Sequence, residues 1–249
     1  MNVNGNSYTY VFSVVMVVLV AVVLSVAALS LKPAQDANIQ KEKKQEILKS
    51  LGVEVTRDEA EASFETYITD QLVLKGGKLE SNPETPAFDI KMADAVAKPM
   101  DEREVPLFIA ERDGKVFYII PVRGKGLWGP IWGYVSILSD GYTIAGATFG
   151  HKSETPGLGA EISLPIFTDQ FPGKKLAVNG AYQSISVRKG DAAGDHQVDG
   201  ISGGTITSVG VESMLNDCLQ PYMSFLLSRS SALTAPEGAA LSDTLISVL

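Results

Sequence analysis

Glycines and hydroxyl side chains are concentrated in one stretch, residues 199–208, which reads Asp-Gly-Ile-Ser-Gly-Gly-Thr-Ile-Thr-Ser. Gly203 and Gly204 lack Cβ atoms, so the backbone can turn tightly there and another group can approach closely. Thr205 and Thr207 follow at the expected start of a helix, where free N–H groups and the helix dipole favour a bound anion. The pattern predicts a phosphate or carboxylate site, although an ordinary Ser/Thr helix cap has the same residue types.

Two further glycine-rich segments could meet this stretch at one edge of a sheet. Residues 124–130 place a tryptophan among glycines, which suits stacking on a ring, and residues 151–161 contain a Pro-Gly-Leu-Gly run whose backbone is free to lie against a flat ring. A long surface turn accounts for the second segment equally well. The candidate ring-binding residues in the two segments are Trp128, Gly157, Leu158 and Gly159.

Several kinds of chemistry are disfavoured by the composition. Glu154 and Glu161 could form an acid–base pair, but no nucleophile accompanies them, and solvated charges are the simpler interpretation. The single cysteine, Cys218, excludes an internal disulfide or a cysteine cluster, and its apolar helical context predicts a buried, inert thiol. His151 and His196 lack the spacing of metal ligands. A net charge of −8 with intermixed lysines argues against nucleic-acid binding, and no dinucleotide or Walker-type glycine motif is present.

The chain begins with an apolar segment. Residues 1–31 carry no charged side chain, and residues 10–31 form an apolar run that, as a helix, is long enough to cross a hydrocarbon layer of ~30 Å. A cleaved signal peptide would need a basic start and a shorter apolar core, so an uncleaved anchor is favoured. The positive-inside rule, taken alone, would place the following domain in the cytoplasm because of Lys32, Lys41, Lys43 and Lys44.

Helices are expected directly after this anchor. Residues 36–51 combine lysines and glutamates with a narrow apolar stripe, which predicts a stalk that ends at Gly52. The Thr-Arg-Asp-Glu run at 56–59 resembles a capping box. We expect it to open a second helix with apolar positions at Phe64, Tyr67, Ile68 and Leu72. Residues 76–100 are polar and interrupted by prolines, so most of them should form loop.

The centre of the chain has strand character and its end has helical character. Two hairpins are expected, one around Asp113-Gly114 and one around Asp140-Gly141, each flanked by apolar runs. Short strands are expected near residues 176–178 and 185–187. The helical period returns over residues 211–227, with a buried face expected at Val211, Met214, Leu215, Cys218, Leu219, Tyr222 and Phe225. The fold class is therefore α+β, with one membrane helix followed by one domain.

Residues 199–205 resemble the flavinylation motif Asp-Gly-x-Ser/Thr-Gly-Ala-Thr of a known family. This family comprises the NqrC subunits of Na⁺-translocating NADH:quinone oxidoreductases (Nqr) and the related RnfG subunits of Rnf complexes. The resemblance implies that Thr205 carries FMN through a phosphoester bond, with Ser202 and Gly203 in the same motif. Gly204 stands where the family usually has alanine, and Thr207 is the alternative acceptor.

Two more segments resemble the flavin-binding loops of this family, residues 154–161 and residues 127–130. The resemblance implies that Glu154 and Thr155 also belong to the cofactor site. The length of the chain and its Lys/Glu stalk are more similar to the NqrC subunits than to the shorter Rnf homologues. The resemblance implies a transmembrane anchor at 1–33, a stalk and first helices at 34–75, and an FMN-binding α+β domain at 76–230. The Ser/Ala-rich remainder, 231–249, is expected to be a loosely ordered tail.

The resemblance also implies a function. The chain would be an electron-relay subunit, inactive alone, in a six-subunit complex that oxidises NADH, reduces quinone and exports Na⁺. A flavin transferase would attach the FMN, and the domain would lie on the periplasmic side of the bacterial inner membrane, against the lysine argument. The alternatives are an Rnf-type subunit serving ferredoxin and NAD, and a membrane-tethered binding module without a cofactor.

Overall fold

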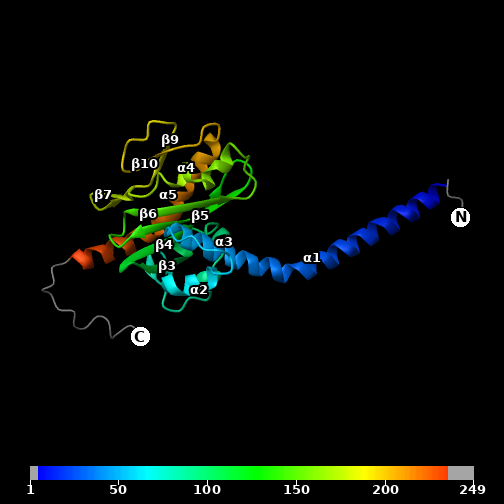
Figure 1. Cartoon of the computed structure of the whole chain (residues 1–249), viewed down its shortest axis with the longest axis horizontal. Helices are drawn as coiled ribbons and strands as arrows, with labels where there is room; N and C mark the ends of the chain where they lie inside the picture. The colour runs from blue at the N-terminus through cyan, green and yellow to red at the C-terminus, as the bar shows by residue number, and fades with distance from the viewer. Residues whose placement is uncertain (1–4, 235–249) are drawn as a thin grey trace. The chain divides into compact units, whose positions relative to one another are not determined.

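The computed structural model describes residues 5–234 and divides into two compact units, Met1–Lys44 and Gln45–Leu249 (Figure 1). The first unit contains most of helix α1 (Asn6–Ser50), which is long and apolar enough to cross a membrane. Its large apolar side chains between Tyr10 and Leu31 are exposed. The helices expected over residues 10–31 and 36–51 are thus parts of one continuous helix, and Gly52 follows its end with a φ of 75°.

The second unit is built on a six-stranded antiparallel sheet with the strand order β2-β1-β3-β4-β5-β6. Two small pairs lie outside this sheet, the antiparallel pair β7–β8 and the parallel pair β9–β10. The strands are β1 (Ile68–Lys75), β2 (Lys78–Leu79), β3 (Glu104–Arg112), β4 (Lys115–Lys125), β5 (Pro130–Leu138), β6 (Ile144–His151), β7 (Ala177–Val178), β8 (Ala181–Tyr182), β9 (Ser186–Arg188) and β10 (Gln197–Asp199).

Helices of very different lengths complete this unit. Among the described residues, α5 is the longest helix that lies wholly within it. The segments that follow α1 are α2 (Ala60–Tyr67), η1 (Ala87–Asp89), α3 (Met92–Ala95), η2 (Met100–Glu102), η3 (Gly159–Ser163), α4 (Pro165–Thr168) and α5 (Thr205–Thr234). The tail expected from residue 231 therefore begins inside α5, and its remainder, 235–249, lies outside the described residues.

Both hairpins expected from the sequence are confirmed. The β3–β4 turn has positive φ at Asp113 (54°) and Gly114 (69°), as a two-residue hairpin turn requires. In the β5–β6 connection, Asp140 accepts hydrogen bonds from the N–H groups of Tyr142 and Thr143, and Gly141 has a φ of 78°. Short polar residues and glycine therefore determine these turns locally, which is why they could be read from the sequence.

The second helix is shorter than expected. It ends at Tyr67, and Ile68, which we expected on its apolar face, begins strand β1 together with Leu72 further along. β1 pairs along its length with β3, so residues 68–75 belong to the sheet rather than to the helical part of the chain. The cause is tertiary: an apolar run that also fits a helical period gains a partner strand that local sequence does not reveal.

The sheet is buried on both faces. Alternate residues of β3 and β4, such as Leu107 and Ile120, face one core that includes the buried side of α5. Their neighbours, such as Phe108 and Ile119, face a second core that includes Leu48 from the end of α1 and Phe64 from α2. The buried face expected for α5 is confirmed, except that Phe225 is only partly buried. The buried residues of this face are Val211, Met214, Leu215, Cys218, Leu219 and Tyr222.

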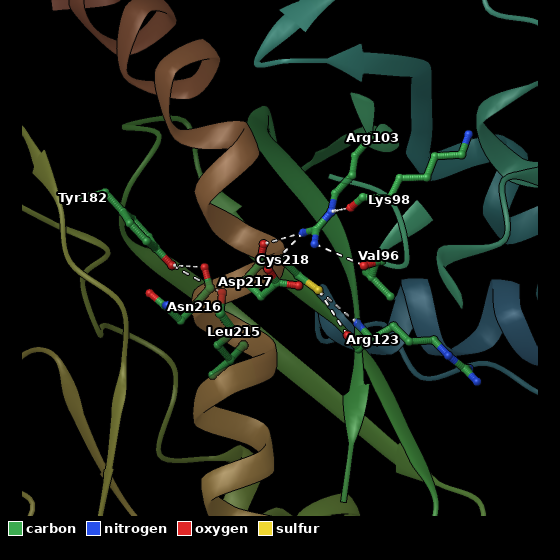
Figure 2. A network of polar contacts seen from close by, with 9 residues as sticks. All are labelled: Val96, Lys98, Arg103, Arg123, Tyr182, Leu215, Asn216, Asp217 and Cys218. Atoms are coloured by element: carbon green, nitrogen blue, oxygen red, sulfur yellow. Dashed lines mark hydrogen bonds and ion pairs between the residues drawn. The ribbon is translucent and has the colours of Figure 1, made fainter. Parts of the chain in front are cut away.

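Polar contacts attach the middle of α5 to its surroundings (Figure 2). The buried guanidinium of Arg103 donates to the backbone oxygens of Val96 and Lys98 and pairs with the Asp217 carboxylate at 3.0 Å. The Cys218 thiol donates to the backbone oxygen of Arg123 at 3.3 Å, and burial raises its pKa to about 11. The thiol is therefore protonated and inert, as the sequence predicted.

Candidate functional site

A cavity of about 400 Å³ lies where the three glycine-rich segments meet, at the N-terminus of α5. The first segment contributes Leu127 and Trp128 to its wall, and the third contributes residues 203–207. From the second segment come Glu154, Thr155, Leu158 and Gly159. The structure thus brings together residues that are separated by up to 80 positions in the chain, as the sequence led us to expect.

Two of the predicted site residues lie elsewhere. Gly157 is at the turn of the second segment with a φ of 76°, and its N–H donates to the Glu161 carboxylate at 2.9 Å. Glu161 therefore holds this turn rather than pairing with Glu154 as an acid or base. Ser202 is exposed and lines a neighbouring cavity that also includes Thr205.

The two candidate hydroxyls differ in accessibility. Thr205 is exposed, is the first residue of α5 and lies on the cavity wall. Thr207 is only 1% exposed, and its hydroxyl donates to Glu154 at 2.6 Å. Thr205 is therefore the more accessible residue, whereas the Thr207 hydroxyl is hydrogen-bonded to a buried carboxylate.

Glu154 connects all three segments. Its side chain is 4% exposed, so the interpretation as a solvated charge is wrong. One carboxylate oxygen accepts the N–H of Trp128 at 2.8 Å, and the other accepts the hydroxyl of Thr207. A Cβ atom at Gly126 or Gly159 would lie 2.6 Å from this carboxylate. These glycines are thus needed because the carboxylate passes close to the backbone of both loops.

The protonation state of Glu154 follows from two opposing effects. Burial alone would raise its pKa. The hydrogen bonds from Thr207 and from the backbone groups of Trp128, Gly129 and Leu127 outweigh burial and lower the pKa below the usual value. The carboxylate is therefore ionised at neutral pH and acts as a fixed acceptor that positions the loops, not as a proton donor.

Apolar side chains give the cavity a surface for a flat ring. Trp128 is 65% exposed although its backbone N–H is hydrogen-bonded to Glu154, and Leu158 and Ile206 are also exposed. A cavity of this size with apolar walls and a few convergent polar groups is typical of a small-molecule or cofactor site.

Two glycines of the motif allow this close packing. Gly203 has a φ of 74°, and a Cβ there would lie 2.6 Å from Leu158. A Cβ at Gly204 would lie 3.1 Å from Ile201 and 3.3 Å from the backbone nitrogen of Gly159. The Gly203 conformation therefore favours glycine strictly, whereas alanine at 204 would need shifts of a few tenths of an ångström.

A second cavity, of about 390 Å³, adjoins the first and was not expected from the sequence. It shares Gly203 and Thr205 with the first cavity and is also lined by Ser202, Arg188 and Lys189. The Arg-Lys-Gly run that begins at residue 188 is the only local signal for it, and such a run is usually a solvated turn.

Comparisons with known proteins agree with this geometry. The model of the FMN-binding domain family matches residues 126–220. The chain is 33% identical to the NqrC subunit of the Na⁺-translocating NADH-quinone reductase of Vibrio vulnificus over 209 residues, which covers 77% of this chain and 82% of that protein. It is 31% identical to the same subunit of Pseudomonas aeruginosa over 239 residues, which covers 86% and 92%.

Solved structures give the same result. The crystal structure of the corresponding Na⁺-translocating NADH-quinone reductase subunit from Parabacteroides distasonis is similar with a TM-score of 0.73 and 43% identity, over 79% of this chain and 96% of that one. The structure of NqrC from Shewanella oneidensis has a TM-score of 0.64 and 25% identity, over 76% and 98%. The protein therefore belongs to the NqrC family of Na⁺-translocating NADH-quinone reductase subunits and contains its FMN-binding domain.

Proposed function

We propose that this protein carries FMN on Thr205 through a phosphoester bond and serves as an electron relay within the Na⁺-translocating NADH-quinone reductase complex. The observation that carries the proposal is the exposed Thr205 hydroxyl at the start of α5, on the wall of a cavity built from all three glycine-rich segments. The family membership supplies the reaction context, namely electron transfer between NADH and quinone coupled to Na⁺ export.

The residues of the cavity fit an FMN group. The phosphate on Thr205 would lie at the N-terminus of α5, where unpaired N–H groups and the helix dipole stabilise a negative charge. The isoalloxazine ring would lie between the apolar surfaces of Trp128 and Leu158. Bound FMN supplies the redox chemistry, and the protein positions it and excludes water from part of its surface.

In this proposal the other residues around the cavity position the loops and the helix start. Glu154 and Thr207 hold the loops against α5 through their 2.6 Å hydrogen bond, so Thr207 serves as a positioning residue rather than as the acceptor. Thr155 and Gly159 line the cavity. Gly203 allows Leu158 to approach the helix start.

The chain acts as one member of a larger assembly. A covalently attached flavin cannot dissociate, which suits a fixed relay between other redox groups. The NADH and quinone sites would therefore lie on other subunits of the complex. We further propose that α1 anchors the protein in the inner membrane as a single span, that the domain lies in the periplasm, and that a flavin transferase loads the FMN there.

The cavity at the motif argues against the module without a cofactor, because that interpretation offers no reason for an exposed threonine to lie on the wall of a cavity built from all three glycine-rich segments. The curated relatives reported above are NqrC subunits of the NADH-quinone reductase, which favours this assignment over the Rnf-type alternative.

The test is flavin attachment after co-expression with the transferase. The denatured wild-type band should fluoresce under ultraviolet light, and mass spectrometry should place the adduct on the peptide that contains Thr205. Thr205→Ala should abolish the fluorescence because the acceptor oxygen is gone. Thr207→Ser keeps the hydroxyl that bonds to Glu154 and should retain the adduct. A fluorescent Thr205→Ala band would refute attachment at this residue.

A further inference from the structure

Thr205 lies on the wall of two cavities, not one. The cavity that contains Trp128 and Leu158 and the second cavity of about 390 Å³ share Gly203 and Thr205 and have otherwise different walls. The second cavity has Arg188 and Lys189 in its lining. A group attached to Thr205 can therefore extend into an apolar space, a cationic space, or both.

Both cations are available to a ligand. Within residues 5–234, the side chains of Arg188 and Lys189 form no hydrogen bond or ion pair. Two nearby carboxylates are already used by the backbone: Asp199 accepts an N–H of the same turn at 2.9 Å, and Glu212 accepts an N–H of β9 at 2.8 Å. Neither Arg188 nor Lys189 is therefore held in an ion pair by the described residues, and both line the cavity beside the helix start.

The backbone that carries these cations is fixed against the motif. β9 and β10 pair in parallel, with Arg188 opposite Asp199, and the N–H of Gly200 donates to the backbone oxygen of Arg188 at 2.7 Å. The turn then reverses at Gly190, which has a φ of 81°. Arg188 is therefore the last residue of a strand that is hydrogen-bonded to Gly200 of the flavinylation motif, and Lys189 follows it directly.

We propose that Arg188 and Lys189 bind the phosphate of the FMN on Thr205, so that FMN spans the two cavities with its phosphate in the cationic one and its ring in the apolar one. This inference rests on the proposed attachment at Thr205. Without an anion, two cations beside the positive end of α5 are unfavourable, and a phosphodiester, which retains its negative charge, removes that repulsion. Arginine and lysine both form strong charge-assisted hydrogen bonds to phosphate oxygens.

The test compares FMN with riboflavin, which lacks the phosphate. Both ligands are titrated into full-length protein produced without the transferase, so that Thr205 is unmodified. Wild-type protein should bind FMN at least about tenfold more tightly than riboflavin, since one charge-assisted hydrogen bond contributes roughly this factor. In Arg188→Gln/Lys189→Gln the preference should shrink to within about threefold, because the helix start alone still favours the anion.

Two controls isolate the phosphate contact. Arg57→Gln/Lys78→Gln removes the same net charge from exposed positions outside both cavities and should leave the preference unchanged. Trp128→Ala should weaken the binding of FMN and of riboflavin by a similar factor, because both ligands have the same ring. The inference is overturned if Arg188→Gln/Lys189→Gln keeps the wild-type preference for FMN over riboflavin. It is also overturned if Arg57→Gln/Lys78→Gln loses this preference to the same extent.

The outcome can be separated from the fate of the proposed function. If the denatured, co-expressed wild-type band fluoresces but the protein does not distinguish FMN from riboflavin, or binds neither, attachment at Thr205 stands and the role of the cations falls. If the band does not fluoresce and neither flavin binds, both proposals fail.

Discussion

At the scale of single residues, the site depends on where a side chain is absent. Gly203 adopts a positive φ and leaves room for Leu158, while Thr205 two positions later stays exposed. Thr207 resembles Thr205 in the sequence and differs from it completely in environment, because it is buried and bonded to Glu154. Chemical type alone therefore leaves two acceptors open, and burial separates them.

Gly203→Ala should destabilise the protein and impair flavin loading. The alanine would have to adopt the unfavourable positive φ of this position, and its Cβ would lie 2.6 Å from Leu158. We expect a loss of more than about 1 kcal/mol in the free energy of unfolding, measured by urea denaturation, with less flavin on the denatured band. Gly157→Ala is the matched control: its φ is 76°, but a Cβ there meets nothing within 4 Å. Equal losses in the two variants would show that the contact with Leu158 is unimportant.

At the scale of elements, the N-terminus of α5 is attached to two loops by one carboxylate. Glu154 joins the first turn of the helix to the loop that carries Trp128, and it does so from a buried position. The middle of the same helix is attached to β4 and to the segment before β3 through Cys218 and Arg103. α5 is thus fixed at several points, so the cavity at its start has a defined shape.

Glu154→Gln should remove a pH-dependent part of the stability. Because the folded-state pKa of Glu154 is lowered, its contribution is complete above the usual value of 4.5 and is lost as the pH falls through the folded-state pKa. At pH 7 the free energy of unfolding of the variant should be lower by about 1–3 kcal/mol, since the glutamine amide cannot accept a hydrogen bond from every donor that faces the carboxylate.

The measurement is urea unfolding at pH 7 and at several values below 4.5. The difference between wild type and Glu154→Gln should narrow at the acidic end. Glu161→Gln is the control, because Glu161 accepts one hydrogen bond from an exposed turn. A difference that stays constant across this range would mean that the ionised form of Glu154 contributes no stability.

At the scale of the whole molecule, two compact units have different chemical surfaces. The first, Met1–Lys44, exposes the apolar side chains of helix residues 10–31, and the second, Gln45–Leu249, has buried apolar cores on both faces of a sheet. The lysines after the apolar run favour a cytoplasmic domain, whereas family resemblance favours the periplasm. These two arguments predict opposite results in one experiment.

Reporter fusions at the C-terminus should distinguish the two orientations. We expect an alkaline phosphatase fusion to be active and a green fluorescent protein fusion to be dark, because the first needs export to fold and the second folds poorly when exported by the general pathway. Deleting residues 1–33 should reverse both signals. A fluorescent full-length fusion with inactive phosphatase would place the domain in the cytoplasm and would support the lysine argument.

The sequence by itself determined the features that depend on local chemistry. The apolar helix, both hairpin turns, the buried face of α5 and the three glycine-rich segments follow from periodicity and from residues with special backbone freedom. The tertiary structure alone decided three others: β1 as a strand, Glu154 as a buried link and the cationic cavity. Each depends on a partner distant in the chain. The Glu154–Thr207 hydrogen bond spans 53 positions, and no local pattern encodes contacts made only after the chain has folded.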